Sequence, residues 1–305
     1  MSADSIGPRF ETSAFDARAA RAALSLGREI GLQHRLVVPR ESMRGLAGAR
    51  LGLEAGASLD FHDYREYQPG DDLRHLDWGV YARSDREIVK LYREEVSPTL
   101  EIVLDDSRSM ALPGTPKAEA ALALAAAFAV AADNARCAHA VWSAGARVAP
   151  LDGAAGPPDA WAPPAFDSPV PPADEILRAP PRWRRNGIRV FISDLLWPSA
   201  PEPLLQRLAG GAAALNVVQL LAAEEESPDL RGQHRFIDVE SGEALDVFVD
   251  DSAAAAYRRA LASHRELWSR ACRRCGATFV SLTAETLLAE RRLAALERAG
   301  VMEGA

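Results

Sequence analysis

The stretch LEIVLDDSRS, residues 100–109, decides the fold of this chain. Its first half, Leu100 to Leu104, is mainly apolar and is predicted to form a buried strand. The pattern D-x-S-x-S follows at once and comprises Asp105, Ser107 and Ser109. Polar residues in this position lie at the carboxyl end of a strand, which is the edge of an open parallel sheet where ligands bind.

Helix and strand patterns alternate along the chain after this stretch. Strands are expected over residues 138–142, 188–192, 215–221 and 277–282, and helices over residues 116–134, 203–208, 252–275 and 284–298. Alternation of this kind joins the strands into one mainly parallel sheet with helices on both faces. Right-handed crossovers make such a sheet doubly wound, so we predict a Rossmann-like α/β fold.

Three regions of the chain differ in composition. Residues 1–45 are predicted to be an N-terminal helical segment, with a helix over residues 14–30. Residues 46–97 are predicted to be a β-rich extension with many glycine and turn residues. Residues 98–300 are predicted to be the α/β domain. Within it, residues 150–181 hold ten of the 20 prolines, which excludes a long helix or a central strand there.

Charge and composition exclude several functional classes. The chain has 305 residues and a net charge of −8, whereas a nucleic-acid-binding protein needs a basic face. The longest apolar run, residues 120–132, is shorter than the roughly 20 residues that span a bilayer. Three cysteines do not form a disulfide framework, and the start of the sequence has no signal-peptide pattern. We therefore expect a cytoplasmic protein without a membrane span.

A second predicted strand, residues 188–192, ends in Ser193 and Asp194. Because the carboxyl ends of parallel strands meet at one edge of the sheet, Asp194 is expected close to Asp105. Carboxylate and hydroxyl oxygens are the ligands that hard cations such as Mg²⁺ prefer. The residues alone leave an alternative open, in which Ser107 and Ser109 cap a turn and the carboxylate of Asp105 is hydrated.

Motifs typical of several enzyme classes are missing from the sequence. It has neither a G-x-x-x-x-G-K-[ST] phosphate loop nor a G-x-S-x-G turn for a nucleophilic serine. Cys272 and Cys275 lie near the expected C-terminal end of a helix, where the helix dipole does not favour a thiolate. The remaining enzymatic alternative is a Mg²⁺-dependent hydrolase built on Asp105, Asp106 and Asp194. It lacks an evident general base, because strand alternation turns Asp106 away from Asp105, so we expect no catalytic activity.

A longer motif precedes the first predicted strand of the sheet. Residues 67–78, YQPGDDLRHLDW, followed by Ala82-Arg83, resemble the signature of the domain-of-unknown-function 58 family. The resemblance covers about residues 35–285. It continues in order through residues 88–90, 94–95 and 104–110, Lys117 with its Ala-rich helix, and residues 192–194 and 238–243.

This resemblance implies a von Willebrand factor A-like domain with a metal-ion-dependent adhesion site. In that site Asp105, Ser107 and Ser109 match the first element, and Asp194 matches the aspartate of the third. The threonine of the second element is missing, because no threonine occurs between Thr115 and Thr278. Ser168 lies where that threonine is expected, and its hydroxyl could replace the threonine hydroxyl as a ligand of Mg²⁺ or Mn²⁺.

The resemblance also implies a function and a partner. Members of the family are commonly found beside MoxR-type AAA+ ATPases, so the chain is expected to be a non-catalytic interaction module that acts as partner or adaptor of such an ATPase. The alternatives are the hydrolase described above and a scaffold whose site no longer binds metal.

Residues 69–83 concentrate charged side chains around the Pro69-Gly70 turn. One interpretation is a second binding surface or an acid–base cluster. The interpretation that we favour is a structural cluster in which Arg74 and Arg83 pair with Asp71 or Asp77. In that case Trp78 is predicted to be buried.

Overall fold

The computed structural model describes residues 16–39, 59–94 and 98–305, with the backbone alone for residues 59–63 and 91–94. The chain forms two compact units. One unit comprises residues 1–37 and 99–305, and the other comprises residues 38–98. The helix that follows the N-terminus therefore belongs to the same unit as the residues after Thr99.

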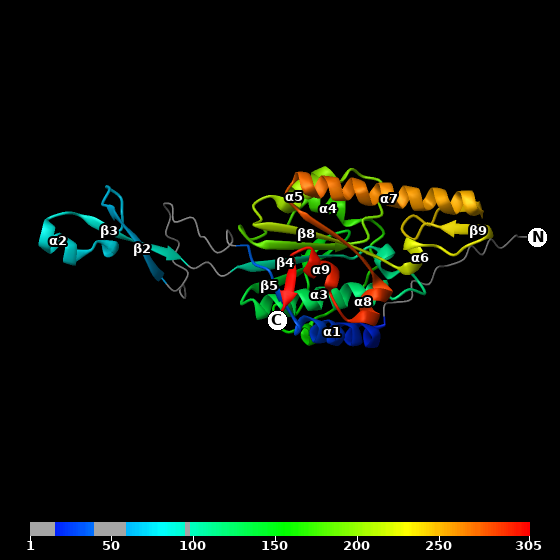
Figure 1. Cartoon of the computed structure of the whole chain (residues 1–305), viewed down its shortest axis with the longest axis horizontal. Coiled ribbons are helices and arrows are strands. Elements are labelled where there is room, and N and C mark those ends of the chain that lie inside the picture. The colour runs from blue at the N-terminus through cyan, green and yellow to red at the C-terminus, as the bar shows by residue number, and fades with distance from the viewer. Residues whose placement is uncertain (1–15, 40–58, 95–97) are drawn as a thin grey trace, which may run out of the picture. The chain divides into compact units, whose positions relative to one another are not determined.

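A six-stranded sheet forms the centre of the larger unit (Figure 1). In spatial order its strands are β11 (Thr278–Thr283), β8 (Ala214–Leu221), β7 (Ile188–Ser193), β4 (Thr99–Asp105), β5 (Ala138–Ala144) and β6 (Val148–Pro150). All neighbouring strands are parallel except the pair β5 and β6. The predicted mainly parallel sheet is therefore confirmed, and β6 adds an antiparallel edge.

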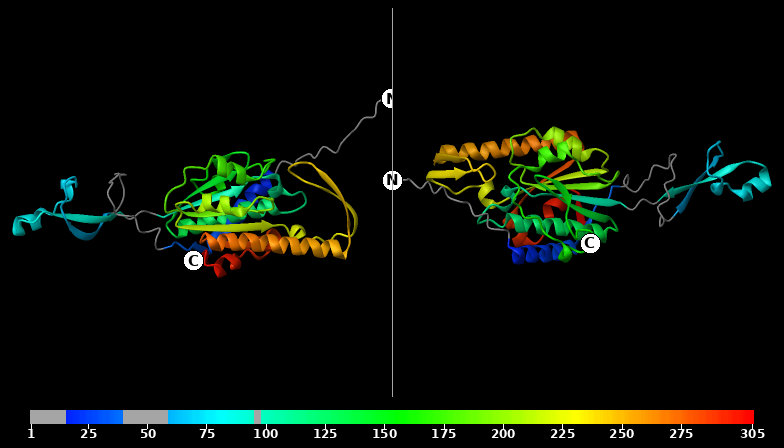
Figure 2. Two further views of the ribbon diagram at one scale, coloured as in Figure 1. Left: turned by 90° about the horizontal axis from the view of Figure 1, so that it is seen from above. Right: turned by 180° about the vertical axis from the view of Figure 1, so that it is seen from behind.

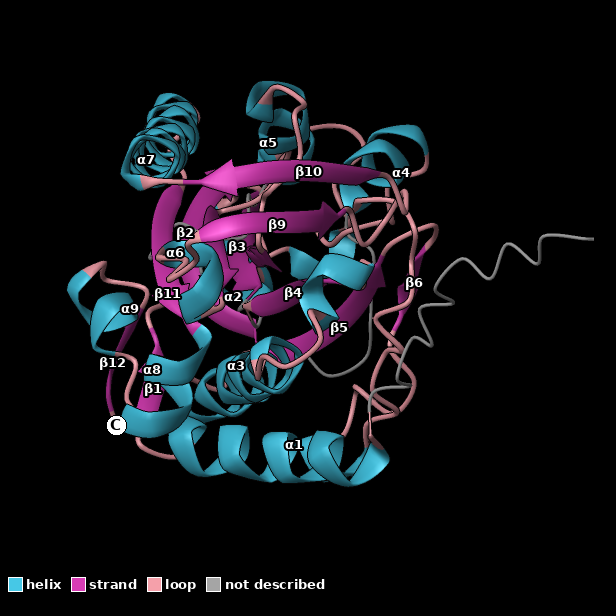
Figure 3. Ribbon diagram, turned by 90° about the vertical axis from the view of Figure 1, so that its right-hand side faces the viewer, coloured by secondary structure: helices cyan, strands magenta, loops and turns pink. Residues whose placement is uncertain are grey.

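Helices cover both faces of the sheet (Figure 3). On one face lie α1 (Ala17–Gly31), α3 (Lys117–Asn134) and α8 (Ala284–Glu290), and on the other lie α4 (Pro172–Arg178), α5 (Pro201–Ala209) and α7 (Asp251–Arg274). Shorter elements are η2 (Arg108–Ala111), η3 (Pro158–Ala160), α6 (Ala223–Glu226) and α9 (Ala294–Arg298). Outside the sheet, β1 (His34–Leu36) pairs with β12 (Met302–Gly304).

The order of the strands creates a crevice between β4 and β7. From β4 the chain passes through α3 to β5 on one side, and from β7 it passes through α5 to β8 on the other. Because α3 and α5 lie on opposite faces, the connections diverge at the carboxyl ends of β4 and β7 (Figure 3). This is the topological switch point, where open α/β sheets bind ligands.

Helix α3 is buried on every side because it lies between the sheet and α1. Except for Glu119, every residue from Lys117 to Ala132 is buried. The small side chains let the two helices approach closely. A Cβ at Gly27 of α1 would lie 2.1 Å from the carbonyl oxygen of Ala123. The alanine-rich composition of α3 therefore reflects tight helix packing.

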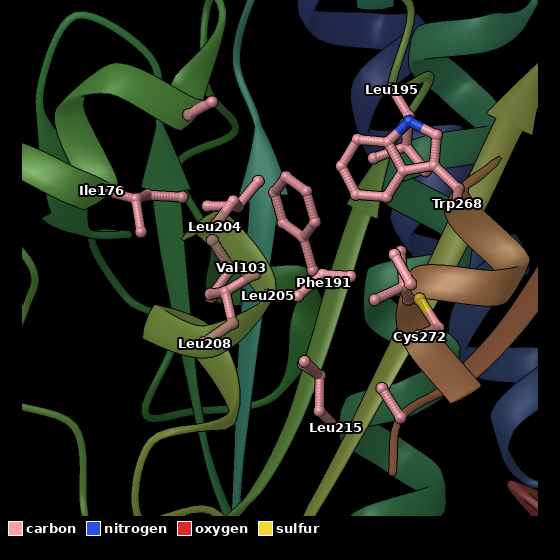
Figure 4. Close-up of a cluster of buried hydrophobic side chains, with 14 of the residues drawn as sticks. Val103, Ile176, Phe191, Leu195, Leu204, Leu205, Leu208, Leu215, Trp268 and Cys272 are labelled. Carbon is pink, nitrogen blue, oxygen red and sulfur yellow. The ribbon is translucent and has the colours of Figure 1, made fainter. Parts of the chain in front are cut away.

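The opposite face of the sheet carries an aromatic core (Figure 4). Phe191 of β7 and Trp268 of α7 are fully buried, and Leu205 of α5 is almost so. The ring of Trp197 meets that of Trp268 edge-on at a centroid distance of 5.7 Å. This packing fixes α5 and α7 against the strands that carry the site.

Two C-terminal features differ from the sequence prediction. The single helix expected over residues 284–298 is broken, because Arg291 adopts a left-handed φ of 53° and ends α8. The apolar residues on either side of Ser241-Gly242 predict a hairpin of residues 236–239 and 244–249. The structure forms it as β9 (Gly232–Ile237) and β10 (Ala244–Val249), so its first strand begins earlier than predicted. The hairpin lies beside α7, as both views of Figure 2 show.

The smaller unit contains the antiparallel pair β2 (Leu59–Glu66) and β3 (Ile88–Glu94), joined through η1 (Leu73–His75) and α2 (Trp78–Ser84). The predicted burial of Trp78 is wrong, since 61% of this residue is exposed. Asp77 caps α2, so Trp78 begins the helix. The indole ring of Trp78 meets that of Tyr81 edge-on at 6.1 Å.

The predicted ion pairs of this unit are also wrong in their partners. Arg74 pairs with Asp72 at 2.6 Å, and Asp71 pairs with Arg65 at 2.8 Å. The Nε of Arg83 donates a hydrogen bond to the carbonyl oxygen of Gly79. These charged side chains thus bond to groups that are close to them in the sequence. Because Trp78 is exposed, the prediction of a structural cluster around a buried indole is wrong.

Candidate functional site

Asp105 and Asp194 converge at the carboxyl ends of neighbouring strands. Asp105 is the last residue of β4, and Asp194 directly follows β7. The register pairs Leu104 with Ile192, which places Ser193 beside Asp105. Both aspartates are buried, with exposed fractions of 0% and 1%. The expected juxtaposition of the two acids at the switch point is therefore present.

The carboxylate of Asp105 is held by neutral donors alone. Its Oδ1 accepts hydrogen bonds from the hydroxyl of Ser107 at 2.6 Å and from the backbone N–H of Ser107 at 2.9 Å. Its Oδ2 accepts a hydrogen bond from the hydroxyl of Ser193 at 2.6 Å. Burial and the negative charge of Asp194 raise the pKa of Asp105 to about 7. Within the part of the chain that the structure describes, the negative charge of this buried carboxylate thus has no Lys, Arg or His as a compensating partner.

Asp194 is in the opposite situation because it has a cationic partner. The Nζ of Lys117, at the start of α3, lies 2.8 Å from Oδ2 of Asp194 and 2.8 Å from Oε1 of Glu225. The side chain of Lys117 is fully buried. Burial opposes ionisation of Asp194, but the charge of Lys117 outweighs it and lowers the pKa of this carboxyl. Lys117 therefore keeps Asp194 ionised.

Ser109 connects the two halves of the site. Its hydroxyl oxygen lies 3.1 Å from that of Ser107. It also lies near the carboxylate of Asp194 and contributes to lowering the pKa of that carboxyl. The hydroxyl of Ser107 donates its hydrogen to Asp105, so it acts as the acceptor toward Ser109. The predicted residues Asp105, Ser107, Ser109 and Asp194 are thus joined in one connected group of oxygen atoms.

Ser168 lies beside this group, but its hydroxyl is engaged elsewhere. The backbones of Ser107 and Ser168 form a parallel bridge, and the N–H of Arg108 donates to the carbonyl oxygen of Ser168 at 3.0 Å. The Ser168 hydroxyl donates to the carbonyl oxygen of Val170 at 2.8 Å. The loop that carries Ser168 is therefore at the site, while its side chain satisfies its own turn.

Asp106 occupies a separate environment. Its carboxylate accepts a hydrogen bond from the hydroxyl of Ser143 at 2.9 Å and another from the backbone N–H of Phe166 at 2.6 Å. It therefore fastens the proline-rich connection to the end of β4. This is a structural role, distinct from that of Asp105.

The chemistry of the donor set fits a hard divalent cation. Asp105 is an uncompensated buried carboxylate, and the hydroxyls of Ser107 and Ser109 lie next to it. Oxygen ligands of this type suit Mg²⁺ or Mn²⁺, both of which bind few protein ligands and retain water. Within residues 16–39, 59–94 and 98–305, no group of three or more His, Cys, Asp or Glu side chains could hold a metal. Serine hydroxyls are therefore essential to the proposed ligand set.

The sequence patterns described above predict no role for three residues that shape the site. Lys117 belongs to the family motif, and a lone lysine at the start of an otherwise apolar helix is a signal for a buried ion pair. Glu225 follows β8 at the same edge of the sheet, and Ser193 immediately precedes Asp194. Both lie at or just after the carboxyl ends of strands, and this position is the sequence signal that indicates a place at the site.

The geometry defines a class of protein, namely an α/β protein with a polar, acid-containing crevice at the switch point of its sheet. The chain belongs to the family described as Protein of unknown function DUF58, whose sequence profile matches residues 63–267. The predicted family membership is therefore confirmed.

Relatives in mycobacteria extend the similarity over most of the chain. The uncharacterized proteins Rv1480 of Mycobacterium tuberculosis and Mb1516 of Mycobacterium bovis are each 30% identical to it over 275 residues. The alignment covers 85% of this chain and 86% of each relative. The family resemblance therefore includes both compact units.

Two solved structures are similar to the chain at low identity. The conserved hypothetical protein BatB from Bacteroides thetaiotaomicron matches with a TM-score of 0.35 and 9% identity, covering 64% of this chain and 97% of its own. An aerotolerance-related membrane protein from Bacteroides fragilis matches with a TM-score of 0.35 and 11% identity, covering 67% and 98%. Because these TM-scores are low, the description of the fold given above rests on the strand order of this chain and not on either structure.

Across its described residues, no helix is both long and apolar enough to cross a membrane.

Proposed function

We propose that this chain is a non-catalytic protein-interaction module that binds a divalent cation at the carboxyl ends of β4 and β7. The observation that supports this proposal most is the buried carboxylate of Asp105, which accepts hydrogen bonds from neutral donors and forms no ion pair with a Lys, Arg or His of the described residues. Burying an uncompensated charge is costly, so such a group either takes up a proton or binds a cation. The proposed cation is Mg²⁺ or Mn²⁺.

The proposed ligands are Asp105, Ser107 and Ser109, with Asp194 as the second acid. Because Lys117 and the backbone N–H of Leu196 occupy both oxygens of Asp194, this side chain is suited to hold a cation-bound water. This arrangement is a degenerate form of the metal-ion-dependent adhesion site of von Willebrand factor A-like domains. The threonine of that site has no counterpart in the proposed ligand set, because the hydroxyl of Ser168, on the loop where it is expected, donates to the carbonyl oxygen of Val170.

A hydrolase that uses the same acids is the second candidate function. It would need a general base close to the cation. Asp106 is unsuited to that task, because Ser143 and Phe166 hold its carboxylate in a separate environment. We therefore favour binding over catalysis. A scaffold without metal is the outcome if no cation binds.

A MoxR-type AAA+ ATPase is the proposed partner, on the basis of the family resemblance. An Asp or Glu of the partner would complete the coordination of the cation, because the site itself offers few ligands. Binding of the cation and of the partner should then be cooperative. The proposed location of the complex is the cytoplasm.

Binding of the purified chain to a purified MoxR-type ATPase tests this function. Because the ATPase itself requires Mg²⁺, a loss of binding on chelation does not show which of the two proteins needs the cation. The informative variant is Asp105→Asn, which removes the charge of the proposed ligand and keeps its size. Asp106→Asn is the matched control at the neighbouring position.

The expected result is at least tenfold weaker capture of the ATPase by Asp105→Asn, with little change for variants outside the site. Equal capture by wild type and Asp105→Asn would contradict a metal-dependent interaction. Hydrolysis of a phosphate ester that is lost in Asp105→Asn would favour the hydrolase instead.

A further inference from the structure

A basic turn lies at the edge of the sheet opposite the candidate site. Residues 182–185, RWRR, follow α4 and precede β7, so they lie at the amino end of that strand. Arg182, Arg184 and Arg185 are exposed. None of the three forms an ion pair with an Asp or Glu of the residues that the structure describes. On a chain with a net charge of −8, this turn is a local concentration of uncompensated positive charge.

A buried ion pair beneath the turn fixes its backbone. Arg189 of β7 and Glu101 of β4 pair at 3.1 Å, and their side chains are almost completely buried. The carboxylate of Glu101 also accepts a hydrogen bond from the backbone N–H of Arg184 at 3.0 Å. The guanidinium of Arg189 donates to the carbonyl oxygens of Arg184 at 3.2 Å and Gly210 at 2.8 Å. The role of this pair is to fix the turn, since buried ion pairs rarely stabilise a fold better than apolar residues do.

Two further residues hold the turn in place. The ring of Trp183 packs against the aromatic core, and the guanidinium of Arg189 lies 4.7 Å from the centroid of that ring. Asn186 has a left-handed φ of 58°, which asparagine adopts more readily than most residues, and its N–H donates to the carbonyl oxygen of Gly211 at 2.7 Å. The backbone of the turn is therefore fixed before any ligand arrives, which lowers the entropic cost of binding there.

The number and type of the exposed side chains indicate the ligand. Arginine binds a carboxylate through two parallel hydrogen bonds, so three arginines on a fixed turn suit an acidic peptide segment. Anionic membranes fit less well, because the segments that bind them contain about four to eight basic residues. A nucleic acid would need a wider basic face than this acidic chain offers. The observations thus favour a protein ligand.

We propose that residues 182–185 form a second interaction surface, which binds a segment of a protein partner that is rich in Asp and Glu. This surface lies at the amino edge of the sheet, whereas the proposed cation site lies at the carboxyl edge. One chain then binds a partner at each edge, as an adaptor does. The inference does not depend on the cation, because the arginines pair directly with the carboxylates of the partner.

A labelled oligoglutamate peptide is the probe for this surface, with an oligoglutamine peptide of the same length as its neutral counterpart. Fluorescence anisotropy measures binding to the full chain in EDTA, so that no cation holds the peptide at the ends of β4 and β7. The double variant Arg182→Gln, Arg185→Gln removes two charges and keeps Arg184, whose backbone the buried pair binds. The matched control is Arg258→Gln, Arg259→Gln, which neutralises two exposed arginines of α7.

We expect the Arg182→Gln, Arg185→Gln variant to bind oligoglutamate about fivefold more weakly than wild type, because each exposed ion pair contributes modestly to affinity. The α7 control and Asp105→Asn should bind like wild type, added salt should weaken binding, and oligoglutamine should not bind. Equal binding by wild type and the turn variant, or no binding to wild type, would overturn the proposal. Binding of wild type to phosphatidylserine vesicles but not to oligoglutamate would also overturn it, and would assign the turn to a membrane surface.

Discussion

The sheet edge and the smaller unit both concentrate charged residues, but they differ in burial. At the sheet edge, Asp105, Asp194 and Lys117 have side chains that are almost completely buried. In the smaller unit, the side chain of Arg74 is 73% exposed and pairs with Asp72 at the surface. Buried charges cost far more free energy than exposed ones, so they persist where geometry or a ligand compensates them. This difference makes the sheet edge the better candidate for a functional site.

The largest effect is expected from removing the buried cation. Lys117→Met leaves the buried Asp194 and the partly buried Glu225 without their positive partner. Breaking a buried ion pair in this way costs about 3–5 kcal/mol of unfolding free energy. Chemical denaturation of Lys117→Met beside Arg178→Ala, which removes the exposed arginine of the pair with Glu175, measures this. Equal losses in the two variants would refute the distinction between buried and exposed charges.

The next effect concerns the dependence of stability on pH. Folding raises the pKa of Asp105 to about 7, so the folded state binds this proton more tightly than the unfolded state does. That stabilisation is complete below the unfolded pKa of about 4 and is lost as the pH rises through about 7. Without metal, the unfolding free energy of wild type should therefore fall by roughly 2–4 kcal/mol relative to Asp105→Asn between pH 4 and pH 8. Parallel curves for the two proteins would show that Asp105 does not titrate in this range.

The smallest effects are expected in the smaller unit. Trp78→Ala removes a side chain that is mostly exposed, so its cost should remain below about 1 kcal/mol. Arg74→Ala should cost about 0.5 kcal/mol or less, because the pair with Asp72 is at the surface. Thermal unfolding of both variants checks these values. A loss of several kcal/mol for Trp78→Ala would mean that the indole is buried in solution.

The sheet could be predicted because local patterns determine its strands. Runs such as 188–192 are apolar except for Arg189 and are followed by polar residues, so both their burial and their ends are visible in the sequence. Asp105 and Asp194 could be placed together for the same reason, since parallel strands share one carboxyl edge.

The remaining features depend on contacts between distant residues. Glu225 meets Lys117 only because α6 and α3 approach the same edge, across 108 positions of sequence. The exposure of Trp78 is a different case, because the adjacent Asp77 caps α2 and makes Trp78 the first residue of the helix, a local feature that the apolar neighbours do not indicate. The contact between Glu225 and Lys117 is instead set by tertiary structure, which local patterns do not encode.

The most direct test of the account is calorimetric titration of the metal-free chain with Mg²⁺ and Mn²⁺, beside Asp105→Asn. Of the two proposed acids, Asp194 pairs with Lys117, whereas no described Lys, Arg or His pairs with Asp105, so the charge of Asp105 should determine cation affinity. We predict saturable binding of one cation per wild-type chain and no measurable binding to Asp105→Asn. Absence of binding to wild type, or equal binding to Asp105→Asn, would contradict the assignment of a cation site to the ends of β4 and β7.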